Sequence, residues 1–439
     1  MGADGGISLK AERALRFRTG KTPSDANRLA RFLASEAGTH VPHYKALFGE
    51  IGLHPERIRS AVDLEAIPIT SRRGISDLPQ TAILRQGSNL ARLHARITSG
   101  STGSPLTVYL SRSELLFRQW LLLRSICRVF PRGLPLTIAD VGQIMAQKMT
   151  HPVRHWGPFK LHRIPAYLPI GEQVRVYVQA KPSLLEGYAG CLELLAEALA
   201  NVPSFPRPRL VVSRGELLVP TARRLIERVF GCRVVDFYNT EEVGNIAWEC
   251  PHRPGILHVN TDACILDLVD NQGHAVSDGC EGRVIVTNLY NLTMPLLRYD
   301  QGDSAIWHEK RARPCSCGAV TPTVRGISGR DDDFILLPDL RRISPLVILS
   351  TVMNAWASQT ADGAYVGQVK QFQVVQERVG ELLVNVIPNP DAQIDLDQAL
   401  ARELAKLHPA LTYEVRVVDE IPLAPSGKLQ RVVSRVGRL

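Results

Sequence analysis

The sequence predicts an α/β protein in which the last hundred or so residues form a separate, small α+β domain. Two runs rich in valine, residues 209–213 (RLVVS) and 232–238 (CRVVDFY), are typical of buried strands, and a helical segment lies between them at 219–230. Alternation of strand, helix and strand is typical of a sheet with crossover helices. Beyond about residue 333 the order changes to two strands, a helix and a further strand.

The elements of the N-terminal part follow from periodicity and from Gly and Pro. Residues 40–79 contain short helical runs that are interrupted by Pro and Gly. Residues 112–130 have helical spacing, because Leu115, Leu116, Gln119, Leu122 and Leu123 follow a 3.6-residue period. A further helix is predicted over 182–200, and Gly231 is expected to end the helix at 219–230 as its C-cap.

The C-terminal part reads as a hairpin followed by a helix and a strand. Residues 371–378 and 381–389 flank Val379-Gly380, which predicts the hairpin turn. Residues 394–407 form an amphipathic helix, and residues 413–418 form the next strand. The apolar stripe of that helix consists of four leucines: Leu396, Leu400, Leu404 and Leu407.

Composition limits the protein class. The chain has 439 residues, 45% of them hydrophobic and 22% charged, which is typical of a globular protein and long enough for two or three domains. The N-terminus lacks the apolar core of a signal peptide, Gly6 breaks the myristoylation pattern, and no apolar run approaches the roughly 20 residues of a membrane span. We expect a cytoplasmic protein without a membrane partner.

The net charge of +9 favours anionic partners, although arginine spread over the surface explains this charge equally well.

A Ser/Thr/Gly-rich loop precedes a strand-like run at 106–110. Its residues are Thr98, Ser99, Gly100, Ser101, Thr102 and Gly103. Such a loop can present backbone N–H groups and hydroxyls to phosphate oxygens, but taken alone it is equally a turn or linker. No Gly-Lys-Ser/Thr follows it, so it is not a Walker A motif.

Five later motifs give this loop its context. They are SRGELL at 213–218, DFYNTEEVG at 236–244, LLRYDQGD at 296–303, GRDDDF at 329–334 and PLAPSGKLQR at 422–431. In this order and spacing they resemble the adenylate-forming superfamily, which contains acyl-CoA synthetases, nonribosomal peptide adenylation domains and luciferases. The segment 42–70 is most similar to the phenylacetate–CoA ligase branch. The resemblance covers nearly the whole chain.

The resemblance implies a large N-terminal domain with mixed sheets over residues 1–332 and a small, mobile C-terminal domain over 333–439. Asp332 would be the hinge about which the small domain rotates between two half-reactions. Lys428 would be the catalytic lysine, because its ammonium can reach the charge that develops on the α-phosphate and the substrate carboxylate.

The same resemblance implies an ATP site. The loop at 98–103 would hold the β- and γ-phosphates, Gly215 and Glu216 would line the adenine pocket, and Tyr238 would stack on the base. Asn239 and Thr240 continue the motif that begins at Asp236, and Asp303, assisted by Arg330, would bind the ribose hydroxyls. Glu242 would bind Mg²⁺ and serve catalysis, with Glu241 as the alternative because it stands where the family usually has Thr or Ser.

A zinc site is predicted from Cys and His spacing. Cys250 precedes a Pro/Gly turn and His258 lies on the returning strand, so the two can face each other across a hairpin. Cys315 and Cys317 complete a set of three thiolates and one imidazole, which suits a structural zinc ion. His252 is an alternative fourth ligand, and reduced cysteines without metal are the alternative to the site as a whole.

The sequence says less about the acid substrate and the acyl acceptor than about the nucleotide site. Residues 141–159 should contribute to the acid pocket, and their Met, His and Trp side chains suit an aromatic acid, although such residues are equally ordinary in a core. Relatives carry a glycine that contacts the pantetheine arm of coenzyme A, yet no glycine lies between Phe334 and Pro345, and Asp339 or Leu340 would narrow the thiol tunnel. Coenzyme A is the default acceptor, with a carrier-protein thiol, an amine or a hydroxyl as alternatives.

A protein of another class remains as a competing hypothesis: a zinc-stabilised nucleic-acid or partner-binding protein without catalysis. The basic charge and the Cys/His cluster would serve it. Against it, Lys428, Glu242 and Asp303 are all present, and the sequence has no interleaved basic and aromatic stripe of the kind that stacks bases. We therefore expect no nucleic-acid partner.

Overall fold

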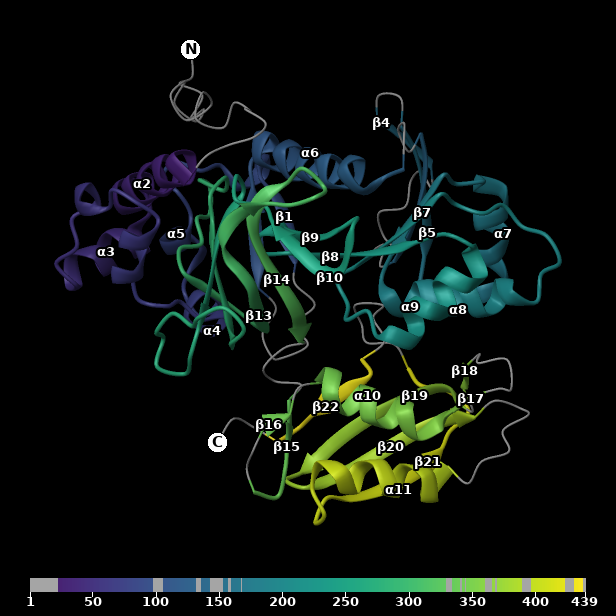
Figure 1. Ribbon diagram of the computed structural model, residues 1–439. Helices are drawn as coiled ribbons and strands as arrows, with labels where there is room; N and C mark the ends of the chain where they lie inside the picture. The colour runs from purple at the N-terminus through teal and green to yellow at the C-terminus, as the bar shows by residue number, and fades with distance from the viewer. Residues whose placement is uncertain are drawn as a thin grey trace. The chain divides into compact units, whose positions relative to one another are not determined.

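The fold is known from a computed structural model (Figure 1). It describes residues 23–97, 106–131, 136–142, 153–156, 159–166, 168–328, 334–339, 342–343, 345–359, 365–367, 369–388, 396–422 and 430–436. The chain divides into two compact units, of which unit 1 comprises Met1–Val129 with Asp236–Ile327 and unit 2 comprises Phe130–Val235 with Ser328–Leu439. Several predicted site residues lie outside the described residues: Thr98 to Gly103, Arg330, Asp332 and Lys428.

Unit 1 combines N-terminal helices with a largely antiparallel sheet (Figure 1). Its sheet runs in the order β11-β12-β13-β14-β10-β9-β8, and β1 pairs separately with β2. The helices are α2 (Pro23–His40), α3 (Pro42–Glu50), η1 (Pro55–Arg57), η2 (Val62–Ala66), α4 (Arg72–Ser76), α5 (Gln80–Ile83), η3 (Leu90–Arg92) and α6 (Arg112–Val129). The strands are β1 (His94–Ile97), β2 (Thr107–Leu110), β8 (Val234–Thr240), β9 (Gly244–Cys250), β10 (Arg253–Val259), β11 (Cys264–Val269), β12 (Glu281–Asn288), β13 (Tyr299–Pro314) and β14 (Val320–Ser328).

The first part of unit 2 is a mainly parallel sheet with crossover helices. Its strands run in the order β7-β6-β3-β5-β4, and only β4 is antiparallel to its neighbour. Helices α7 and α8 contact these strands, and α9 packs on α8 (Figure 1). The elements are β3 (Thr137–Gly142), β4 (Val153–Trp156), β5 (Phe159–Pro165), α7 (Ile170–Ala180), β6 (Leu184–Gly187), α8 (Ala189–Ala200), β7 (Leu210–Arg214) and α9 (Pro220–Phe230).

The C-terminal part of unit 2 is a small α+β fold. A four-stranded sheet runs in the order β21-β20-β19-β22, and helices α10 and α11 contact each other. The elements are β15 (Ile335–Leu336), β16 (Arg342–Ile343), α10 (Pro345–Trp356), β17 (Ala357–Gln359), β18 (Tyr365–Gly367), β19 (Val369–Arg378), β20 (Glu381–Pro388), α11 (Leu396–Leu407), β21 (Thr412–Val417) and β22 (Val432–Ser434).

Most predicted elements are confirmed, and so is the α/β class. Helix α6, the unit β7–α9–β8, the hairpin β19–β20, helix α11 and strand β21 lie where the sequence places them. Gly231 ends α9 with φ of 65°, a left-handed conformation that glycine adopts without steric cost. Leu400 and Leu404, in the predicted leucine stripe, are buried.

The single helix predicted over 182–200 is wrong at its start. Residues Leu184–Gly187 form β6, and α8 begins only at Ala189. All four residues of β6 are buried, so this strand lacks the alternation that distinguishes a strand from a helix in sequence. Gly187 is required there, because a Cβ at this position would lie 2.3 Å from the carbonyl oxygen of Val141 on β3.

The beginning of α6 is held by a capping box and a buried carboxylate. Ser111 and Glu114 form a capping box, in which the Ser111 amide donates to Glu114 Oε2 over 2.6 Å and the Glu114 amide donates to Ser111 Oγ over 3.3 Å. The second oxygen of Glu114 accepts hydrogen bonds from the amides of Leu292 and Thr293. This buried carboxylate therefore ties the end of β2 to the segment that precedes the RYDQGD motif.

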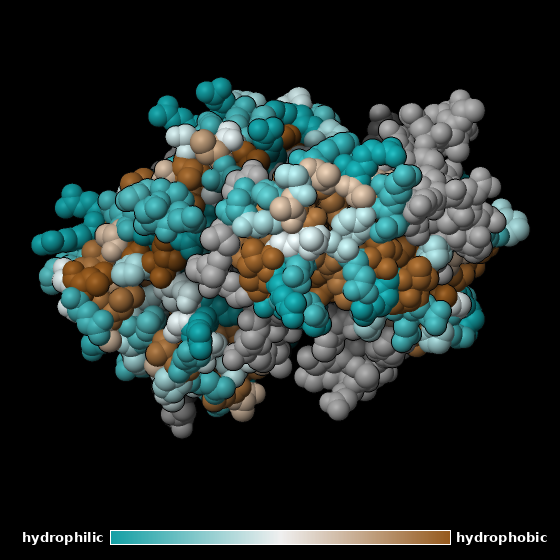
Figure 2. Space-filling view, turned by 90° about the horizontal axis from the view of Figure 1, so that it is seen from below, coloured by the Kyte–Doolittle hydropathy of each residue, from teal (hydrophilic) through white to brown (hydrophobic). Residues whose placement is uncertain are grey.

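The exposed large hydrophobic side chains of the described residues are spread over several elements. On the face shown in Figure 2, hydrophobic residues are interspersed with hydrophilic ones. The exposed large hydrophobic side chains come from separate elements, such as Leu116 of α6, Ile170 of α7, Val320 of β14 and Val417 of β21. Within the described part of the chain, no helix is both long enough and apolar enough to cross a membrane.

Candidate functional site

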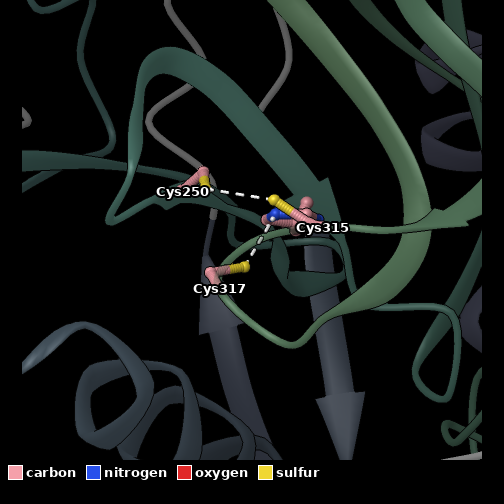
Figure 3. A group of neighbouring side chains, drawn as sticks. Cys250, Cys315 and Cys317 are labelled. Carbon is pink, nitrogen blue, oxygen red and sulfur yellow. Dashed lines mark hydrogen bonds between the residues drawn. The ribbon is translucent and has the colours of Figure 1, made fainter.

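Four metal-ligating side chains converge in unit 1. Cys250 ends β9, His258 lies on the adjacent strand β10, and Cys315 and Cys317 occupy the turn between β13 and β14. Their ligand atoms all lie within 4.8 Å of one another. Figure 3 shows the sulfur atoms of the three cysteines turned toward a common centre. The fold thus assembles the predicted set from two hairpins that are about sixty residues apart in the chain.

The separations suit a tetrahedral ion. Cys250 Sγ lies 3.6 Å from Cys315 Sγ, and Cys317 Sγ lies 3.3 Å from His258 Nε2. Zinc binds sulfur at about 2.3 Å and imidazole nitrogen at about 2.0 Å, so neighbouring ligand atoms of a tetrahedral site are about 3.5–3.8 Å apart. These two separations are within a few tenths of an ångström of that range, and all four ligand atoms lie within 4.8 Å of one another.

The surroundings of His258 favour a neutral imidazole, the form that binds a metal. Burial and the nearby positive charges of Arg128 and Arg253 lower the pKa of His258 to about 4. Its Nδ1 lies 3.1 Å from Thr321 Oγ1, which orients the ring so that Nε2 faces Cys317. The Trp248 ring lies 4.8 Å from the His258 ring.

Charge around the cluster also fits a metal–thiolate group. Hydrogen bonds from the Cys317 amide and from neighbouring groups outweigh burial and lower the pKa of Cys315 to about 7, whereas burial raises the pKa of Cys317 to about 11. The guanidinium of Arg128, 5.5 Å from the Trp248 ring, is near enough to Cys317 for their charges to interact. Zinc with three thiolates carries one net negative charge, which this arginine would offset.

His252, the alternative fourth ligand, lies outside the cluster. Its backbone amide donates to Cys250 Sγ over 3.4 Å, while its Nδ1 lies 3.2 Å from Ser316 Oγ. The side chain of His252 thus contacts the turn and not the group of ligand atoms.

Two motif residues of unit 1 that are far apart in sequence are in direct contact. The Tyr238 hydroxyl, at the end of β8, donates to Asp303 Oδ2 on β13 over 2.6 Å. The predicted base-stacking and ribose-binding residues, 65 positions apart in sequence, are therefore neighbours. Asn239 and Thr240 follow directly on β8, and the Thr240 hydroxyl accepts a hydrogen bond from the Val243 amide.

The two candidate magnesium ligands differ sharply in environment. The Glu242 side chain is 4% exposed and forms an ion pair with Arg72 on α4, whereas the Glu241 side chain is 45% exposed. Arg118 of α6 donates to the backbone oxygens of Thr240 and Glu241 over 2.8 and 2.7 Å and also pairs with the Glu241 carboxylate. The Tyr290 hydroxyl donates to the Val243 oxygen over 2.7 Å, so the loop that presents Glu242 is held from both sides.

Arg72 and Arg118 are residues that the sequence does not single out as part of this site. They lie 170 and 123 positions from their acidic partners. No local motif distinguishes them from the other arginines of this basic chain.

In unit 2, the predicted adenine-pocket residues follow the last residue of β7. Gly215 has φ of 73°, and Glu216 Oε2 accepts a hydrogen bond from the Gly190 amide at the start of α8 over 2.8 Å. The carboxylate therefore lies at the positive end of a helix. The roles proposed for Gly215 and Glu216 stay predictions.

Comparison with known proteins extends the resemblance over most of the chain. The sequence is 23% identical over 387 residues to a phenylacetate–coenzyme A ligase of Thermus thermophilus, covering 83% of this chain and 79% of the relative. It is 23% identical over 418 residues to the corresponding ligase of Aromatoleum evansii, covering 90% of both chains. The chain is similar to the phenylacetate–CoA ligase branch of the adenylate-forming superfamily.

Two further matches concern the small domain and the fold. The CapK C-terminal domain family matches residues 353–435, within the predicted small domain. The crystal structure of 2-hydroxyisobutyryl-CoA ligase, in its postadenylation state with 2-HIB-AMP, matches with a TM-score of 0.76 and 19% identity, covering 96% of this chain and 91% of that one. This structural match confirms the predicted fold.

Proposed function

We propose that the protein is an AMP-forming acid–thiol ligase that activates a carboxylic acid with ATP. The acid would attack the α-phosphorus, giving acyl-AMP and pyrophosphate, and a thiol would then take the acyl group and release AMP. The observation that carries this proposal is the ordered set of motifs from Thr98 to Lys428, in a chain similar over nine-tenths of its length to a phenylacetate–CoA ligase.

The described residues support specific roles in nucleotide binding. Asp303 offers two acceptor oxygens for ribose hydroxyls, and its hydrogen bond from Tyr238 fixes both side chains in one arrangement. Arg118 and Tyr290 hold the backbone of residues 240–243 and thereby orient Glu242. Lys428, in the small domain, would supply positive charge to the α-phosphate as pyrophosphate leaves.

Glu242 fits a Mg²⁺ ligand better than Glu241. A hard cation needs carboxylate oxygen, and Glu242 is a buried carboxylate whose charge is offset by Arg72 alone among the described ion pairs. Magnesium bound there would neutralise phosphate charge. Glu241, which is half exposed and held by Arg118, would contribute to loop geometry.

A structural zinc ion would be bound by Cys250, His258, Cys315 and Cys317. The ligand separations fit zinc, and all four tetrahedral positions would be filled by protein, which is typical of a structural site. The ion would tie the β9–β10 hairpin to the β13–β14 turn.

Coenzyme A is the proposed acceptor, and the acid is proposed to be aromatic. The residue that raised doubt about the thiol tunnel, Asp339, has its carboxylate 3.7 Å from His408 Nε2 within the small domain. Leu340 lies outside the described residues.

ATP–pyrophosphate exchange with a panel of aryl and alkyl acids tests the first half-reaction. Lys428→Ala should abolish exchange almost completely yet spare acyl transfer from supplied acyl-AMP, because the lysine acts on the phosphate chemistry only. Lys406→Ala is the matched control, since Lys406 is an exposed lysine of α11 bonded to Glu403. Absence of exchange with every acid, or equal loss of both half-reactions in Lys428→Ala, would contradict the proposal.

Preformed acyl-AMP offered with coenzyme A, with free amines or with buffer alone identifies the acceptor. Rapid AMP release with coenzyme A and not with amines is the expected result. Turnover with amines in place of coenzyme A would instead make the protein an amide synthetase.

A further inference from the structure

A row of charged side chains crosses the parallel sheet of unit 2. Asp140 on β3 is the register partner of Arg163 on β5 and of Glu186 on β6. Arg214, the last residue of β7, reaches both carboxylates: its Nη2 lies 2.7 Å from Asp140 Oδ1, and its Nε lies 3.7 Å from Glu186 Oε2. Two acids and two arginines thus share one region of the sheet.

This row lies on the side of the sheet that faces away from the apolar core. The alternate residues Ala139, Val141, Leu185 and Val211 belong to the hydrophobic core cluster, whereas Asp140 and Glu186 do not. Because successive side chains of a strand point to opposite faces, the charged residues face the other side.

The row also lies beside the segments predicted to bind substrate. The segment 141–159, predicted to contribute to the acid pocket, begins directly after Asp140, and Gly215 and Glu216 of the predicted adenine pocket follow Arg214 directly. The charged residues lie in the carboxyl-terminal halves of parallel strands, the edge at which open α/β sheets bind ligands.

Glu186 is incompletely satisfied in this arrangement. Its side chain is 8% exposed, and its Oε2 has no hydrogen-bond donor in the part of the chain that the structure describes. Arg214 uses Nη2 for Asp140, while its Nε lies 3.7 Å from Glu186 Oε2, too far for a hydrogen bond, so that each of these two atoms has no hydrogen-bond partner among the described residues. A buried carboxylate oxygen without a donor costs free energy, so a donor from a bound molecule would be stabilising.

We propose that Glu186, held between Asp140 and Arg214, is a specificity-determining residue that selects acids carrying a hydroxyl or amino group on the acyl moiety. The inference rests on the proposed adenylation activity and deepens it, because it names the class of acid. A plain hydrocarbon acyl group would leave Glu186 without a donor. A pocket that hydrogen-bonds a substrate group rejects the analogue lacking it more strongly than an apolar pocket rejects an extra group.

The test uses the full-length protein with ATP and Mg²⁺ and measures ATP–pyrophosphate exchange. The acids are matched sets: phenylacetate with its 4-hydroxy and 4-amino derivatives, benzoate with its hydroxy and amino derivatives, and butanoate with its 4-hydroxy and 4-amino derivatives. Within each set that supports exchange, we expect a donor-bearing acid to have a kcat/KM at least about 10-fold above that of the unsubstituted acid. The hydroxy and amino arms distinguish a neutral donor from a cationic one.

Variants separate recognition by Glu186 from a structural role. Glu186→Leu should lower kcat/KM for the preferred acid by about 10- to 100-fold, mainly through KM, and leave the unsubstituted acid unchanged or improved. Glu186→Gln, which keeps shape and an acceptor oxygen, should retain part of the preference and serves if the leucine variant does not fold. Leu185→Val is the matched control, since Leu185 lies on the same strand and faces the core.

The possible outcomes distinguish failure of the inference from failure of the proposed function. Exchange without preference for donor-bearing acids, or equal loss for all acids in Glu186→Leu, overturns the inference and leaves the proposed function intact. Absence of exchange with every acid overturns the proposed function and the inference together.

Discussion

The Cys/His cluster of unit 1 and the charged row of unit 2 are both sets of four side chains brought together by β-structure, but they differ in completeness. In the cluster, four ligand atoms lie within 4.8 Å of one another, close enough for one ion to bind all four. In the row, Arg214 satisfies Asp140 directly, while an oxygen of the buried Glu186 has no donor among the described residues. A closed set is typical of a structural site, whereas an open set is typical of a site that receives a ligand.

Glu242 is intermediate between these two cases. Its buried carboxylate is matched by Arg72 within unit 1, yet its motif predicts that it binds magnesium. We therefore expect three effects in decreasing order. Variants of the Cys/His cluster, the closed set, should lose much stability. Variants of Glu242 should lose much activity, and variants of the charged row, the open set, should show a modest pH-dependent change in stability.

The largest effect is expected from opening the closed set. Cys317→Ser should abolish binding of zinc, and we expect a loss of about 4 kcal/mol in the free energy of unfolding, because loss of a structural metal is among the most destabilising single changes. Elemental analysis of the purified protein gives the metal content, and denaturant unfolding gives the stability. Cys280→Ser is the control, since Cys280 is an exposed free cysteine.

The histidine variants sharpen the same point. His258→Ala should lose the metal as Cys317→Ser does, while His252→Ala should keep it, because the His252 side chain contacts Ser316 outside the cluster. Full metal content in both His258→Ala and Cys317→Ser would show that the metal is bound elsewhere. The four residues would then be reduced, metal-free groups.

The next effect is expected at the intermediate site. Glu242→Gln should lower kcat/KM of ATP–pyrophosphate exchange by about 100-fold, equivalent to about 2.7 kcal/mol, because the amide cannot supply a negative charge to Mg²⁺. The loss should shrink as the Mg²⁺ concentration rises. Glu241→Gln is the matched neighbour and should change the rate by less than about 3-fold; the reverse order would identify Glu241 as the magnesium ligand.

The smallest effect is expected at the open set, as a dependence of stability on pH. Burial, opposed by Arg214, raises the pKa of Glu186 from 4.5 to about 7. The unfolded chain therefore releases this proton at lower pH than the folded chain, so the wild type loses stability as pH rises from about 4.5 to about 7.

Glu186→Gln removes this titration. The variant should gain stability relative to the wild type across that pH range, by roughly 3 kcal/mol at pH 8. Melting temperatures of both proteins between pH 5 and pH 8 measure the difference. Parallel pH profiles would show that Glu186 is fully paired in the folded protein and would remove the distinction between the two sets.

The sequence by itself determined much of the fold and the composition of one site. Gly231 predicts a helix boundary from local chemistry, and Cys250, His258, Cys315 and Cys317 can be named because thiols and imidazoles have few other roles in such spacing. The strand β6 was the exception, because a wholly buried strand has no alternation to separate it from a helix.

Which charged residues pair with one another was determined only by the tertiary structure. Arg72 reaches Glu242 across 170 residues, and the row of Asp140, Glu186 and Arg214 exists because parallel strands from three separate segments align in register. Arginine, aspartate and glutamate are common surface residues, so their sequence carries no mark of burial. Whether such a charge is solvated, matched or left open depends on which strands become neighbours, and that is a property of the folded sheet.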